Sequence, residues 1–79
     1  MSRLKKIITQ VLEIPAEKIT DKTSPDNTPS WDSFNGLMLV SELEKAFGVS
    51  FTMAEVVAVK RVADIKKYLK KHGVKTDEI

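Results

Sequence analysis

Residues 31–48 read WDSFNGLMLVSELEKAFG, and this stretch predicts one long helix. Asp32 has a short side chain that can cap free backbone N–H groups, and its charge suits the positive end of a helix dipole. Gly48 is typical of the residue that follows a helix, because glycine adopts the left-handed conformation at little cost. The helix should therefore begin at Asp32-Ser33, run to about Phe47 and stop at Gly48.

This helix has two separate apolar sides when its residues are placed about 100° apart. One side is a candidate core stripe made of Leu39, Val40, Leu43, Ala46 and Phe47. The other side should face water, and it holds Phe34, Leu37 and Met38 together with Ser41, Glu42 and Lys45. Apolar residues grouped on an exposed side are typical of a contact surface for a partner. The alternative is a central helix that is buried nearly all round.

The segment before this helix predicts an amphipathic helix and a long loop. The helix begins at Ser2 and stops near Pro15, and its apolar side consists of Leu4, Ile7, Ile8, Val11 and Leu12. Residues 15–31 contain all three prolines of the chain and read as a loop. Loops of this length are uncommon in compact domains. We therefore expect Ile14, Ile19 and Trp31 to attach it to the core.

Two more helices are expected after Gly48. Thr52 and Glu55 have the spacing of a capping box, and the apolar run 56–59 follows, so a short third helix is predicted. A fourth helix over Arg61–His72 should place Val62, Ile65 and Leu69 inward and end at Gly73. Residues 74–79 are expected to be a flexible tail. The predicted fold class is all-α, a small four-helix bundle with a long loop between the first two helices.

Composition limits what the chain can do. Its 79 residues suit a single domain, too small to enclose a deep active site without weakening its core. The chain has no cysteine and one histidine, His72, so we expect neither a metal site nor a catalytic residue, and the protein should not be an enzyme. The N-terminus lacks the apolar stretch of a signal peptide, and no segment is long and apolar enough to span a membrane. We expect a cytoplasmic monomer.

Charge is distributed unevenly. Residues 1–12 carry a net charge of +3, residues 13–55 carry −5 and residues 56–79 carry +4. The basic fourth helix allows a rival interpretation, a helical module that binds nucleic acid or a membrane surface. Its lysines are not interleaved with aromatic residues, and a solvated lysine face is the commoner explanation, so we expect no nucleic-acid partner.

Ser33 stands where the loop meets the predicted second helix. It could simply cap that helix. A nucleophilic serine is the weaker interpretation, because it needs a positioned base and an oxyanion site, whereas His72 lies in the lysine-rich fourth helix.

The residues around Ser33 resemble the acyl carrier protein family, in which an Asp-Ser-Leu motif opens the second helix. Here the motif is Asp32-Ser33-Phe34, and it is followed by Leu39, Leu43, Glu44, Phe47 and Gly48. The resemblance covers the whole chain, with the same helix order, loop and short third helix. It implies a bundle of acyl carrier type and a single carrier domain over residues 1–79.

The resemblance also implies a cofactor and partners. A phosphopantetheinyl transferase would use coenzyme A and Mg²⁺ to join 4′-phosphopantetheine to the Ser33 hydroxyl, and the arm would carry acyl groups as thioesters. Asp32 would present the motif to the transferase. Partner enzymes that load or use the acyl group would dock on Phe34, Leu37, Met38 and Ser41. Carriers of this family can shelter acyl chains between their second and third helices; the candidate walls here are Leu39, Val40, Leu43, Val56 and Val57. The alternative for each of these five residues is an ordinary place in the core.

Three positions depart from the family pattern. Phe34 replaces the usual leucine, and Asn35 and Met38 occupy positions where fatty-acid-synthesis carriers typically have acids. Together with the basic first and fourth helices, these departures speak against the general fatty acid carrier, which stays the alternative. The loop Thr23-Ser24-Pro25-Asp26 followed by Trp31-Asp32-Ser33 resembles the freestanding carriers of specialised pathways, which serve polyketide, aminoacyl or polysaccharide-modifying enzymes. Gly36 costs its helix about 1 kcal/mol relative to alanine. It could permit close packing or open space for the cargo.

Overall fold

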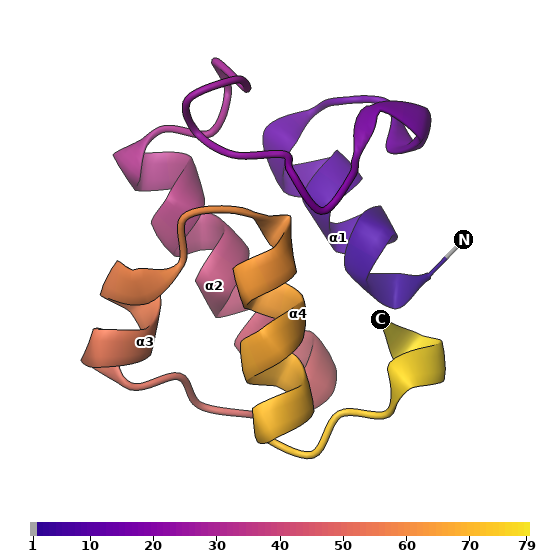
Figure 1. Cartoon of the computed structure of the whole chain (residues 1–79), viewed down its shortest axis with the longest axis vertical. Coiled ribbons are helices and arrows are strands. Elements are labelled where there is room, and N and C mark those ends of the chain that lie inside the picture. Colours follow the sequence, from indigo (N-terminus) through magenta and orange to yellow (C-terminus); the bar gives the residue numbers. More distant parts are fainter. Residues whose placement is uncertain (1) are drawn as a thin grey trace.

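The computed structural model describes residues 2–79. Its four α-helices are α1 (Arg3–Leu12), α2 (Ser33–Phe47), α3 (Met53–Ala58) and α4 (Val62–Lys71). Two short 3-10 helices follow α1 and α4, namely η1 (Ala16–Lys18) and η2 (Thr76–Glu78). No strand occurs among these residues. The predicted all-α, four-helix fold is confirmed (Figure 1).

The core lies where α1, α2 and α4 meet. Its fully buried side chains come from all three helices and are Leu4, Ile8, Leu12, Leu39, Leu43, Val62, Ile65 and Leu69. On α2, Val40 and Phe47 are half-buried and pack against this cluster. The predicted inward faces of the three helices are thus confirmed. Short α3 differs, because its only buried residue is the charged Glu55.

Each helix begins and ends for a local reason. The Ser2 hydroxyl accepts a hydrogen bond from the Lys5 N–H at the start of α1 (3.1 Å). That helix ends at Leu12, before the expected stop near Pro15, because Glu13 adopts a left-handed conformation (φ 55°). The helix α2 ends at Gly48, which is also left-handed (φ 67°), as predicted.

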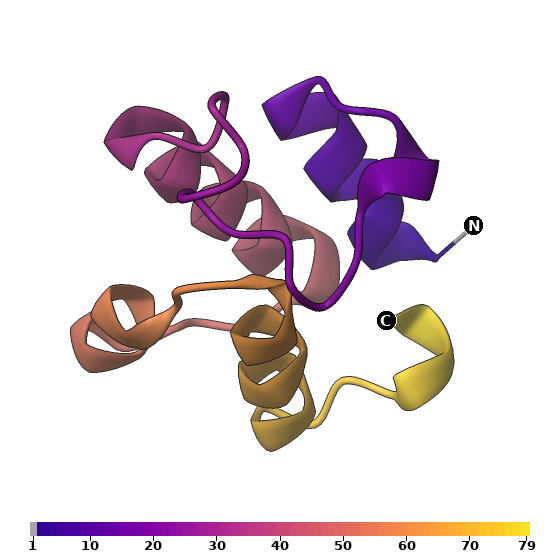
Figure 2. The ribbon, with the colours of Figure 1, turned by 45° about the horizontal axis from the view of Figure 1, so that its top comes forward.

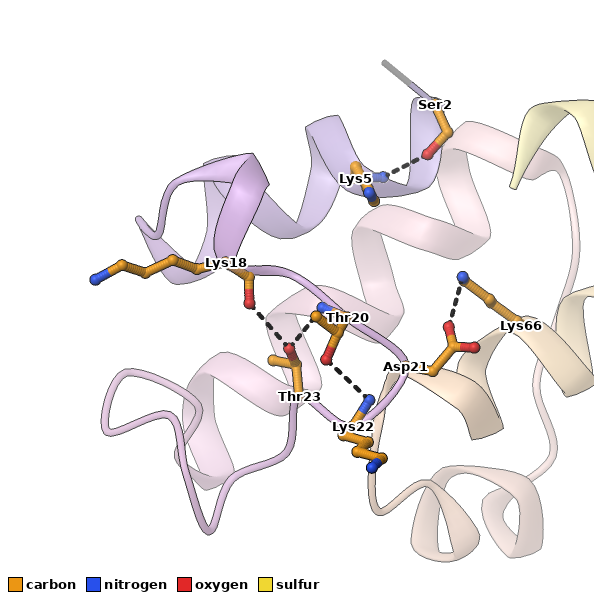
Figure 3. A network of polar contacts seen from close by, with 8 residues as sticks. All are labelled: Ser2, Lys5, Lys18, Thr20, Asp21, Lys22, Thr23 and Lys66. Atoms are coloured by element: carbon orange, nitrogen blue, oxygen red, sulfur yellow. Dashed lines mark hydrogen bonds and ion pairs between the residues drawn. The ribbon is translucent and has the colours of Figure 1, made fainter.

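The long loop lies beside the start of α4 (Figure 2) and is bonded to this helix (Figure 3). The first-turn N–H groups of Val62 and Ala63 donate to the carbonyl oxygens of Thr23 (2.9 Å) and Asp21 (3.1 Å). The Asp21 carboxylate also pairs with Lys66 Nζ at 2.6 Å. Because α4 has no side-chain cap, these loop carbonyls satisfy donors that would otherwise lack partners.

The loop is also anchored to the core. Ile19 and Trp31 are buried in it and Ile14 is half-buried, as the sequence predicted. Within the loop, the Thr23 hydroxyl accepts from the Thr20 N–H (2.9 Å) and lies 3.4 Å from the Lys18 carbonyl, and the Lys22 N–H donates to the Thr20 hydroxyl (3.2 Å). Figure 3 shows these contacts.

The C-terminal segment returns to the start of α1 (Figure 1). Arg3 pairs with Glu78 at 3.0 Å, donates to the Ala46 carbonyl and lies over the Phe47 ring at 4.8 Å. Val74 and Ile79 are half-buried against the core. The flexibility expected for residues 74–79 stays a prediction.

None of the helices within residues 2–79 combines the length and apolar character that crossing a membrane requires.

Candidate functional site

The start of α2 is capped by Asp32. Its carboxylate accepts a hydrogen bond from the Asn35 N–H at 2.8 Å. Ser33 is the first residue of the helix, and it is exposed. The interpretation of Ser33 as the capping residue is therefore wrong, because the residue before it fills that position.

Among residues 2–79, no hydrogen bond involves the Ser33 hydroxyl. The only imidazole, His72, is bonded to Glu55 at 2.9 Å. Beside Ser33, the Asn35 amide donates to the Ser30 carbonyl at 2.8 Å, which fastens the end of the loop to the first turn of α2. The serine is thus held on a fixed backbone while its hydroxyl stays free.

Exposed apolar side chains follow Ser33 along α2. Phe34 is 70% exposed, Leu37 62% and Met38 44%, and Ser41 is exposed as well. The predicted water-facing side is confirmed, and a helix buried nearly all round is excluded. Met53 and Val57 of α3 are also exposed. Sequence reasoning missed them as surface residues, although their spacing of four places them on one side of that helix.

An apolar cleft of about 410 Å³ opens beside Ser33 between α2, α3, the start of α4 and the loop. Three of the proposed cargo walls, Leu39, Val40 and Val56, line it. The other two do not, because Leu43 is fully buried in the core and Val57 points into solvent. Sequence reasoning missed five lining residues that come from the loop, α2, the α3–α4 link and α4, namely Pro25, Trp31, Leu37, Val59 and Ile65.

Gly36 allows α2 to approach Trp31 closely. A Cβ atom added to Gly36 would lie 3.3 Å from Nε1 of the indole, which is tighter than most such contacts. Gly36 also lines the cleft. The close neighbour of Gly36 is thus the Trp31 side chain of the loop and not another helix, and the role of this glycine in making space for the cargo stays a prediction.

Short α3 is fastened by the charges around Glu55. The Glu55 carboxylate accepts from the Thr52 N–H (2.9 Å) and contacts His72 Nε2 (2.9 Å) and Lys71 Nζ (3.1 Å) from the end of α4. The backbone N–H of Thr52, and after it the bonds from His72 and Lys71, lower the pKa of Glu55 to about 2, although burial opposes this shift. Val56, which lines the cleft, directly follows this anchored residue.

Lowering the pH should weaken the contacts of the Glu55 carboxylate and so destabilise the fold. Because the pKa of Glu55 is lower in the folded than in the unfolded chain, its contribution to stability is present above about pH 4.5 and is lost as the pH falls towards 2. Urea unfolding of the wild type should show falling stability across this range, and Glu55→Gln should flatten the fall. Asp21→Asn is the control, since its ion pair with Lys66 is exposed and contributes less. If the unfolding free energies of wild type and Glu55→Gln fell in parallel as the pH is lowered, this role of the buried carboxylate would be contradicted.

Comparisons with known proteins agree with this geometry. The family model described as phosphopantetheine attachment site matches residues 2–69. An acyl carrier protein of Phytoplasma australiense is 31% identical over 72 residues, which cover 91% of this chain and 95% of that protein. An acyl carrier protein of Rickettsia bellii (strain OSU 85-389) is 39% identical over 41 residues, 52% of this chain and 51% of that protein.

The fold and the family match define a protein that binds phosphopantetheine. Within that class, the chain belongs to the acyl carrier protein family. Its prosthetic group is covalently attached 4′-phosphopantetheine, whose terminal thiol carries acyl groups as thioesters.

The start of α2 fits this group. The first turn of the helix contains no acidic residue, and its free N–H groups and the positive end of the dipole favour a phosphate. The exposed hydroxyl of Ser33 leaves room for a bulky substituent. Asp32 and Ser33 line the cleft together with apolar residues, so an arm that starts here has an apolar surface beside it.

Proposed function

We propose that Ser33 is the attachment point of the 4′-phosphopantetheine arm. The observation that carries this proposal is the free, exposed hydroxyl at the first position of α2, where Asp32 already supplies the cap. A phosphopantetheinyl transferase would form the bond between the Ser33 oxygen and the phosphate of the arm, using coenzyme A and Mg²⁺. Residues 1–79 then act as one carrier domain, and Ser33 needs no catalytic base of its own.

Site mapping tests this proposal directly. The protein is incubated with a promiscuous transferase, coenzyme A and Mg²⁺, its intact mass is measured, and its peptides are sequenced by tandem mass spectrometry. We expect one added group, located on Ser33 and not on Ser30 or Ser41. A group on another serine would contradict the assignment.

We also propose that Phe34, Leu37, Met38 and Ser41 form the docking surface for partner enzymes. Three large apolar side chains, all at least 44% exposed, lie within two turns of the arm's proposed attachment point. Charge is sparse here, because Asn35 is neutral and its amide is turned to the Ser30 carbonyl. The surface differs from the acidic one expected of fatty-acid-synthesis carriers. We infer partners in a specialised pathway, of polyketide, aminoacyl or polysaccharide-modifying type.

Malonyl transfer by the enzyme of general fatty acid synthesis tests this inference. The holo protein should accept malonyl groups with a much lower kcat/KM than that enzyme's own carrier. Met38→Glu restores an acid on the docking surface and should raise kcat/KM severalfold through faster association. Lys67→Glu makes a larger charge change on exposed α4 and should have little effect. Equal use of the wild-type protein and the fatty acid carrier would contradict the specialised role.

A further inference from the structure

Trp31 presents an unpaired hydrogen-bond donor in the wall of the cleft. Its side chain is only 5% exposed, and it lines the cleft beside Gly36. The indole edge that carries Nε1 and Cδ1 faces Gly36, since a Cβ atom added there would lie 3.3 Å and 3.6 Å from these two atoms. Gly36 itself lines the cleft, so this edge lies at its surface.

The indole N–H finds no acceptor among residues 2–79. The Nε1 atom is not among the buried polar atoms that lack a partner, so it keeps contact with solvent in the open cleft. Cargo that fills the cleft would cover this donor, and a buried donor without an acceptor costs free energy. The other buried or half-buried side chains of the wall are apolar and cannot accept a hydrogen bond; they are Leu39, Val40, Val56, Val59 and Ile65. Asp32 and Ser33 are exposed residues at the start of α2. Trp31 is therefore the polar group on the buried part of the wall.

We propose that Trp31 is a specificity-determining residue, whose N–H binds an oxygen of the acyl cargo. A short acyl chain with a hydroxyl or keto oxygen near its thioester can place alkyl carbons against the apolar wall and offer an acceptor to the indole. A plain hydrocarbon chain of the same length leaves the N–H unpaired. A volume of about 410 Å³ lies at the small end of the range for small-molecule sites, which favours short cargo. This inference rests on the proposed attachment at Ser33.

The indole signal gives a direct test, because Trp31 is the only tryptophan of the chain. The full-length protein is prepared in apo, holo, butanoyl, β-hydroxybutanoyl and acetoacetyl forms, each checked by intact mass. In ¹H–¹⁵N spectra, we expect the Nε1–H resonance to lie further downfield in the two oxygenated forms than in the butanoyl form, where the hydrocarbon chain covers the donor without offering an acceptor. One position in all three loaded forms, or a shift already complete in the holo form, would overturn the proposal.

The variant Trp31→Phe allows a second test, because it removes the indole N–H but keeps an aromatic ring in the core. Release of each acyl group by hydroxylamine is timed in wild type and variant, after thermal melts show that both are folded. The lost hydrogen bond should make release of β-hydroxybutanoyl roughly two- to tenfold faster, with butanoyl release unchanged. Equal effects on both cargoes would show that Trp31 only packs. Failure of attachment at Ser33 would appear earlier, as a missing mass gain, so the two proposals fail separately.

Discussion

Ser33→Ala is expected to abolish attachment of 4′-phosphopantetheine, with no residual modification of the chain. The substitution removes the only atom that can form the phosphate bond at this position. It should leave the fold intact, because Ser33 is exposed and the Asp32 carboxylate keeps its bond to the Asn35 N–H. Alanine is also a favourable helix residue. Loss of modification would therefore report the missing hydroxyl and not a damaged helix.

Intact mass after incubation with transferase, coenzyme A and Mg²⁺ measures the result. Ser50→Ala is the matched control, since Ser50 is an exposed serine in the link between α2 and α3 and is not one of the docking residues. It should be modified as completely as the wild type, and all three proteins should melt at similar temperatures. A mass gain in Ser33→Ala equal to that of the wild type would refute the assignment of the attachment point.

Leu43→Ala is expected to remove a large part of the stability of the domain. Leu43 is fully buried between α2 and the rest of the core. Truncation of a buried leucine costs about 2–5 kcal/mol through lost apolar burial and the cavity left behind. A domain of this length has only about 4–12 kcal/mol of unfolding free energy in total. The variant should therefore be partly unfolded at room temperature or close to it.

Leu37→Ala provides the comparison, because it is the same substitution on the same helix at a residue that is 62% exposed. Its unfolding free energy should stay within about 0.5 kcal/mol of the wild type. Urea titration followed by helical circular dichroism measures both variants. Similar losses at the two positions would mean that α2 does not divide into a core side and a docking side.

Periodicity predicted most of this fold. Placing residues about 100° apart around the second helix separates Leu39 and Leu43 from Phe34 and Leu37, although all four are apolar. In the structure, Leu39 and Leu43 are buried, whereas Phe34 and Leu37 are exposed. The capping box at Thr52 and Glu55 and the glycine end at Gly48 were also predicted, because each depends on residues close together in the chain.

Contacts between distant segments were not predictable in the same way. The capping box gave no sign that Glu55 would be buried against Lys71 and His72, which lie 16 and 17 positions later. Nor did the loop sequence show that its carbonyl groups would cap α4. The assignment of Val57 to the cleft was wrong because a six-residue helix has too few turns to determine which side packs inward. Such features depend on how helices meet, which local spacing does not encode.

The return of the C-terminal segment to the start of α1 affects how the protein can be handled. In both views of the ribbon, the C-terminal end lies beside the beginning of α1, and the start of α2 lies on the opposite side of the molecule (Figures 1 and 2). An affinity tag or a fused enzyme added after Ile79 would project away from Ser33. The proposed attachment point and the exposed residues that follow it would stay accessible, so immobilised or fused forms of the carrier should still meet their partner enzymes.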